Sequence, residues 1–170
     1  MSISASSSNI ELWVYCFRAL MLRSSEAKMK FASKIKDPVL KSMMTIIALD
    51  HKRNAQILEL LFNIDKDKPL VDPMSRSCEE VLGRATLENI RKATSRIREL
   101  LREDISSDAA LEDFSRTIEQ LNDITKGILI SLADVLEKMG DPRHIVMRYL
   151  ASTYENHKKL FLEIKHRFLH

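Results

Sequence analysis

The sequence predicts an all-α protein built from two antiparallel helical hairpins, and three observations indicate this fold class. The chain has only three Gly and four Pro in 170 residues, so few positions favour turns. Its apolar residues recur at intervals of three and four, which is the period of helices and not of strands. Asp-Pro dipeptides at 37–38 and 141–142 each precede a short pair of polar residues by a nearly equal distance. This repeat predicts that one helical hairpin is used twice in the chain.

The first hairpin is predicted from helices at about 9–36 and 38–63. The apolar residues of the first helix follow a 3-4 spacing, beginning at Ile10 and Trp13, which is typical of a bundle helix. Asp37 can cap the second helix, and Pro38 suits its first turn because the missing N–H is not needed there. The Ser-rich tail at 1–8 is predicted to be flexible. The remainder, 9–170, has the size of one ordinary domain and is predicted to be one.

The second hairpin is predicted from helices at about 108–139 and 142–168, with Gly140 as the stop between them. A turn-rich connection at 64–76 and a helix at about 77–104, with a weak point at Gly83, lie between the two hairpins. This extra helix has a narrow apolar stripe, which indicates packing on the outside of the bundle or against a second copy. The stripe consists of Val81, Ala85, Ile90, Ala93, Ile97 and Leu100 or Leu101. We therefore expect a homodimer, the commonest symmetric assembly.

Charge and cysteine usage narrow the function classes. The net charge of +3 is too small to predict binding to nucleic acid or to a membrane. Arginines make the helix at 77–104 basic, but acids interleave with them at helical spacing, which favours ordinary surface pairing. Cys16 and Cys78 stand alone with no Cys-x-x-Cys, so two buried, reduced thiols are expected. With no signal-peptide pattern and no long uncharged apolar run, a cytoplasmic protein is expected.

Two pairs of polar residues interrupt the apolar stripes. His51 with Asn54, and Tyr154 with His157, each lie three residues apart. Di-metal bundles place one Glu on each of two helices and a Glu-x-x-His pair on each of the other two, all pointing inward. In this chain the spacing of the metal-binding pairs is kept while the carboxylates are missing.

The segment 21–54 resembles the first half of rubrerythrin-related proteins of the ferritin-like superfamily. Residues 32–38 echo an Ala-x-Lys-Ile-x-Asp-Pro sequence, and residues 47–54 and 150–157 echo a Leu-Ala-x-x-Glu-x-x-His pattern. The resemblance implies a ferritin-like four-helix bundle of two antiparallel hairpins with an extra helix in the long crossover. It also implies a di-iron centre with peroxide reduction or ferroxidase chemistry.

The resemblance assigns the six ligand positions of that centre to residues without a carboxylate. These degenerate di-iron positions are Met21, His51, Asn54, Thr125, Tyr154 and His157. Two ferrous ions would bring four positive charges into the core, where uncompensated charge is costly. We therefore expect no di-iron centre and a hydrogen-bonded polar layer in its place. The nearby acids Glu26, Asp50 and Glu155 are rotated from these positions by about 100° or more and are expected to point to the flanks.

Two functions from different classes stay open. The first is a non-catalytic bundle that acts as a binding or assembly module, with no cofactor and with a second copy or an unidentified protein as partner. The second is a rubrerythrin-like metalloprotein with altered ligands, an oxidoreductase or a metal store. In that case His51, His157 and the phenolate of Tyr154 would hold a single transition metal, since imidazole suits such ions. Metal content separates the two hypotheses.

Overall fold

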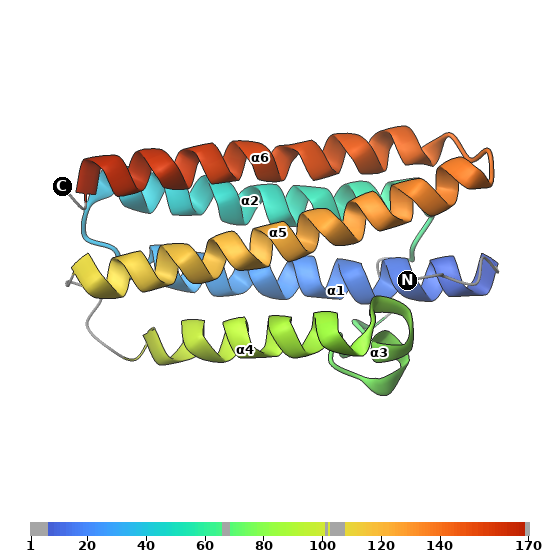
Figure 1. Cartoon of the computed structure of the whole chain (residues 1–170), viewed down its shortest axis with the longest axis horizontal. Helices are drawn as coiled ribbons and strands as arrows, with labels where there is room; N and C mark the ends of the chain where they lie inside the picture. Colours follow the sequence, from blue (N-terminus) through green and yellow to red (C-terminus); the bar gives the residue numbers. More distant parts are fainter. Residues whose placement is uncertain (1–6, 66–68, 101, 103–107, 169–170) are drawn as a thin grey trace. The chain divides into compact units, whose positions relative to one another are not determined.

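The computed structural model describes residues 7–65, 69–100, 102 and 108–168 (Figure 1). All regular structure in this part of the chain is helical, which confirms the all-α class. Two compact units divide the chain, Met1–Leu87 and Glu88–His170. The ferritin-like arrangement and the single domain at 9–170 stay predictions. Most of the predicted tail at 1–8 lies outside the described residues, although the first helix already begins at Ser7.

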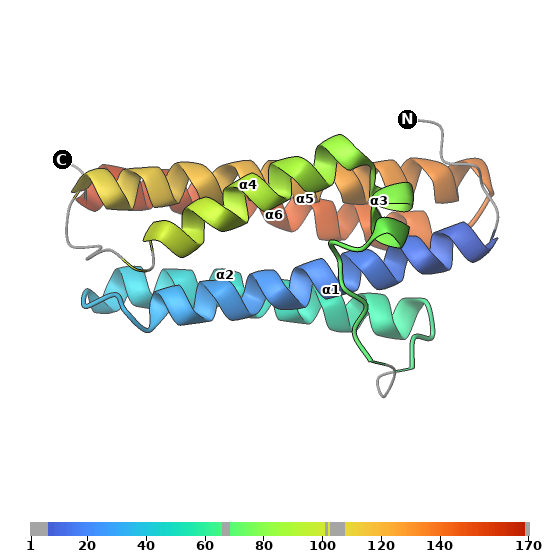
Figure 2. The ribbon, with the colours of Figure 1, turned by 90° about the horizontal axis from the view of Figure 1, so that it is seen from below.

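The first unit is built on a hairpin of α1 (Ser7–Ala32) and α2 (Pro38–Leu61), which lie side by side in both ribbon views (Figures 1 and 2). As predicted, Asp37 caps α2, since its carboxylate accepts a hydrogen bond from the N–H of Leu40 at 2.8 Å. α1 ends at Ala32, four residues earlier than predicted. The N–H of Lys34 bonds the carbonyl of Phe31 in a tighter turn, and Pro38 disfavours helix at the residue before it.

The end of α2 is closed by its own backbone. The N–H of Ile64 bonds the carbonyl of Glu59 at 2.8 Å, and Asn63 adopts a left-handed conformation with φ of 51°. Asn tolerates this conformation better than most residues, and the pattern is a common way to satisfy the last carbonyls of a helix. The turn at 62–64 is therefore a capping motif.

A disulfide joins α1 to the short helix α3 (Arg76–Leu82), which packs on α1. Cys16 and Cys78 have their Cα atoms 5.6 Å apart, so the prediction of two reduced thiols is wrong. The absence of a Cys-x-x-Cys motif excludes only a pairing between cysteines that are close in sequence. Packing brings this pair together although the two residues are 62 positions apart.

The helix predicted at 77–104 is two helices, α3 and α4 (Arg84–Leu100). Gly83 separates them with φ of 87°, a backbone conformation that residues with a Cβ rarely adopt. The break shifts the helical phase, so Leu82 and Leu87 are buried in place of the predicted Val81 and Ala85. The rest of the predicted stripe, from Ile90 to Leu100, is buried as expected. Residues 101, 103 and 104 of the predicted helix lie outside the described residues.

The second unit contains the hairpin of α5 (Asp108–Lys138) and α6 (Arg143–Phe168). Gly140 has φ of 70°, and the N–H of Asp141 bonds the carbonyl of Leu136 at 2.9 Å, which confirms the predicted stop. The guanidinium of Arg143 binds the Asp141 carboxylate and lowers the pKa of that carboxyl. These contacts fix the tight connection between α5 and α6.

None of the helices in the described ranges is long and apolar enough to cross a lipid bilayer. The cytoplasmic location stays a prediction. The disulfide is more typical of an oxidising compartment, because structural disulfides are rarely maintained elsewhere.

Replacing both Cys16 and Cys78 by Ser is expected to lower the free energy of unfolding by about 4 kcal/mol, because the crosslink removes loop-closure entropy from the unfolded chain. Equilibrium urea unfolding of both proteins, with and without reductant, measures this change. Reductant should bring the wild type down to the double variant and leave the variant unchanged. A wild type that is insensitive to reductant would show that the two cysteines are not joined in solution.

Candidate functional site

Polar side chains occupy the buried face of α1. Arg18, Met21, Ser25 and Lys28 follow each other at intervals of three, four and three, which places them on one face of the helix, and all four are buried. Buried Lys and Arg are rare in proteins unless a partner accepts their hydrogen bonds. The core face of the first hairpin is therefore built from specific polar contacts rather than from apolar packing alone.

Lys28 is the most unusual member of this face. Its side chain is only 2% exposed, and its Nζ donates to the Ser24 hydroxyl at 2.6 Å. The same Nζ lies 3.0 Å from Nε2 of His51 on α2. Burial lowers the pKa of Lys28 from 10.5 to about 7, because removing an ammonium from water favours its neutral form. Burial therefore shifts the loss of the ammonium proton from alkaline pH toward neutral pH.

His51 and Asn54 point inward, as the sequence predicts. His51 is 1% exposed and Asn54 is fully buried. Near them, the Ser25 hydroxyl donates to the carbonyl of Ala48 at 2.7 Å, which ties α1 to the backbone of α2. Met21, the first degenerate ligand position, is also buried.

A buried ion pair lies in the same hairpin. Nε of Arg18 donates to a carboxylate oxygen of Glu59 at 2.6 Å, and both side chains are more than nine-tenths buried. Sequence reasoning missed Arg18, Glu59 and Lys28. A signal for the two basic residues was available, because Arg18 lies three residues before Met21 and Lys28 seven after it, on the face already predicted to point inward.

The second unit holds the other polar pair. Tyr154 and His157 are both buried on α6, and their rings meet edge to face with centroids 5.4 Å apart. On α5 Asn122 is buried, while Thr125 is partly exposed and donates to the carbonyl of Leu121 at 2.7 Å. Neither polar atom of the Asn122 side chain has a hydrogen-bond partner among the described residues.

The acids nearest the predicted ligand positions point to the flanks, as expected. Glu26 is exposed, and Asp50 pairs with Arg53 at 3.0 Å. Glu155 is bound by Lys126, a contact that lowers the pKa of the Glu155 carboxyl. Asp50 and Glu155 are therefore paired with basic residues, and Glu26 faces solvent.

The residues present do not fit the di-iron centre that the resemblance implies. A basic side chain contacts His51, the position of a bridging glutamate, and would add positive charge beside two cations. Among the described residues, no three His, Cys, Asp or Glu side chains are grouped so that they could hold a metal ion. The single-metal site of His51, His157 and Tyr154 would join residues of both units and stays a prediction.

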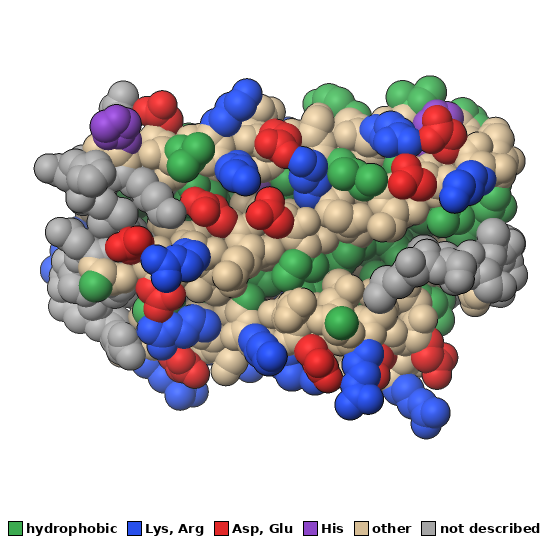
Figure 3. Space-filling model, viewed as in Figure 1, with side chains coloured by type: hydrophobic (Ala, Val, Ile, Leu, Met, Phe, Trp, Pro, Cys, Tyr) green, Lys and Arg blue, Asp and Glu red, His purple; other side chains and the backbone are tan. Residues whose placement is uncertain are grey.

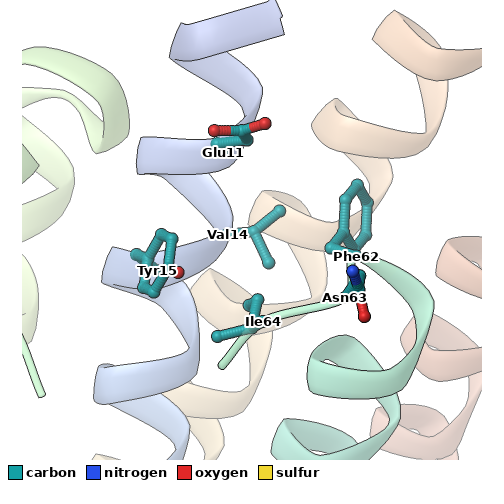
Figure 4. Close-up of a pocket in the computed structure, with 6 residues that line it drawn as sticks. All are labelled: Glu11, Val14, Tyr15, Phe62, Asn63 and Ile64. Carbon is teal, nitrogen blue, oxygen red and sulfur yellow. The ribbon is translucent and has the colours of Figure 1, made fainter. Parts of the chain in front are cut away.

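A separate small pocket of about 180 Å³ lies in the first unit, where the chain leaving α2 folds back on α1 (Figure 4). None of the predicted ligand positions lines this pocket. Its lining residues are Glu11, Val14, Tyr15, Phe62, Asn63 and Ile64. The pocket therefore follows from the capping turn of α2.

Comparison of the chain with protein-family models, with curated proteins and with solved structures gave no match. The resemblance to the ferritin-like superfamily stays a prediction.

Replacing Lys28 by Met is expected to remove a rise in stability with pH. Between about pH 7 and 10.5 the unfolded chain holds a proton on Lys28 that the folded chain has released, so the free energy of unfolding increases with pH. The increase should approach about 1.4 kcal/mol per pH unit in that window and vanish below it, where both states are protonated. Urea unfolding of both proteins across the window tests this. Parallel pH profiles of wild type and K28M would contradict the assignment.

Replacing Arg18 by Met is expected to cost about 3–5 kcal/mol, because Glu59 is left buried without its partner. The double variant R18M/E59L should recover most of the loss. Arg23, which pairs with Asp72 at the surface, is the matched control, and R23M should cost less than about 1 kcal/mol. A loss for R18M no larger than that for R23M would show that the buried pair does not form.

Proposed function

We propose that this chain is a ferritin-like helical bundle that lacks a di-iron centre and acts as a non-catalytic binding or assembly module. The observation that carries the proposal is the contact between Lys28 and His51. At the position where the resemblance expects a bridging glutamate, the chain has an imidazole next to an amine. An anion that would neutralise metal ions is thereby replaced by a group that can carry positive charge.

The charge balance supports the loss of metal chemistry. A metal ion on His51 would require Lys28 to be neutral, since two positive groups a few ångströms apart in a poorly solvated interior repel strongly. The acids next in sequence to the predicted ligand positions do not compensate, because Asp50 is paired with Arg53 and Glu155 with Lys126. The core thus favours proton exchange at Lys28 over metal binding.

A bundle without a metal centre can still bind another protein through its surface. The predicted homodimer fits this role, since a second copy or another protein is the partner that a non-catalytic module would bind. Under this proposal the buried polar contacts serve to fix how α1 and α2 pack, and the ligand lies outside the core.

Iron analysis of the full chain, purified from cells grown in iron-rich medium, is expected to find well below one iron per chain. K28M should also remain iron-free, because removing the amine does not restore the missing carboxylates. A ferritin purified from the same medium is the positive control. Two equivalents of iron bound to the wild type, with loss on mutation of His51 or His157, would overturn the proposal and support the metalloprotein with altered ligands.

A further inference from the structure

Arginines form a line on the exposed side of α4. Arg91 and Arg98 are seven residues apart on α4, and Arg102 lies four positions after Arg98, in a turn where its N–H bonds the carbonyl of Glu99. At about 100° per residue, the side chains of Arg91 and Arg98 fall within about 20° of each other. All three arginines are exposed. Figure 3 shows several Lys and Arg side chains, with acidic side chains among them, over the position of α4 in Figure 1.

Glu99, the acid that follows Arg98, is engaged with another residue. Glu99 accepts a hydrogen bond from Arg96 at 3.0 Å, and Arg96 also binds Asp113 on α5 through Nε at 2.7 Å. These bonds raise the pKa of Arg96, with the Asp113 contact as the larger cause. Within the described ranges, none of the three arginines of the line makes an ion pair. Sequence reasoning expected the interleaved acids to neutralise this helix, but among the described contacts the pairing of Glu99 is with Arg96 and not with the line.

We propose that Arg91, Arg98 and Arg102 form a docking surface for an acidic amphipathic helix of a partner protein. This inference rests on the proposed binding function and names the chemistry of the partner. Seven residues of helix rise about 10.5 Å, so carboxylates that recur every seven residues on a neighbouring helix match the spacing of Arg91 and Arg98. A guanidinium binds a carboxylate through two parallel hydrogen bonds, which gives each pair a defined geometry.

The spacing favours a helix over nucleic acid. Phosphates of one DNA strand advance about 3.4 Å each along the axis and follow a curved path, whereas the line on α4 is straight and sparse. Ser95, which is small and exposed, lies between Arg91 and Arg98 on the same side of the helix and lets a neighbouring helix approach closely. The net charge of +3 adds little general attraction for a polyanion.

The test uses the full chain and a fluorescein-labelled synthetic helical peptide of about three heptads, with one glutamate in register in each heptad. A scrambled peptide of the same composition and a labelled DNA duplex are the competing probes. Fluorescence anisotropy should show tighter binding of the in-register peptide than of either, with an affinity that falls as salt is added. The variant R91A/R98A/R102A should bind it at least about tenfold more weakly, since three charge-assisted pairs are lost.

The matched control is K36A/K41A/K52A, which removes the same charge from exposed lysines of the first unit and should bind like the wild type. Circular dichroism melting checks that both variants fold. Equal binding of wild type and R91A/R98A/R102A, equal losses in the two triple variants, or equal binding of the scrambled peptide would overturn the inference. Tighter arginine-dependent binding of the duplex would also overturn it in favour of nucleic acid. If the protein is free of iron and does not bind the peptide, only the docking inference is contradicted. If the protein binds iron, the proposed function is contradicted.

Discussion

A lysine amine held 3.0 Å from a histidine ring inside a helical hairpin decides which charges the core of the first unit can accept. Burial holds the pKa of Lys28 near 7, so this core exchanges a proton close to neutral pH. Each further positive charge placed there competes with that proton. The same contact therefore explains why a metal ion fits poorly at His51 and why the stability of the hairpin depends on pH.

The buried polar side chains of α1 are compatible with a core because groups of α2 accept their hydrogen bonds. Arg18 meets Glu59, and Ser25 meets the carbonyl of Ala48. Each contact fixes one level of α1 against α2, since a sliding of either helix would leave a buried donor or acceptor without its partner. The disulfide between Cys16 and Cys78 adds a covalent tie from α1 to α3. Such contacts favour one helix register more strongly than interchangeable apolar side chains do.

The features that the sequence predicted well are those determined by neighbouring residues. Asp37 and Gly140 delimit helices through hydrogen bonds within a few positions, so local patterns were enough to place them. The inward position of His51 followed from helical periodicity. The partners of buried groups were not predictable in this way: the Cys16–Cys78 pair joins residues 62 apart, and Lys28 reaches His51 from another helix. Lysine is also usually exposed, so its residue type favoured solvent for Lys28, although the helical spacing places it on the core face of α1.

Arg96 and Arg98 show how position on one helix separates structural charge from available charge. Two residues of helix rotate the side chain by about 200°, which turns Arg96 toward Glu99 and Asp113 while Arg98 faces outward with Arg91. An arginine that already binds two carboxylates has little left to offer a partner, whereas an exposed guanidinium keeps all its donors for one. Burial and exposure thus have opposite effects on positive charge in this chain. Burial disfavours the charged form of Lys28, whereas exposure leaves the charge of Arg98 available to bind a partner.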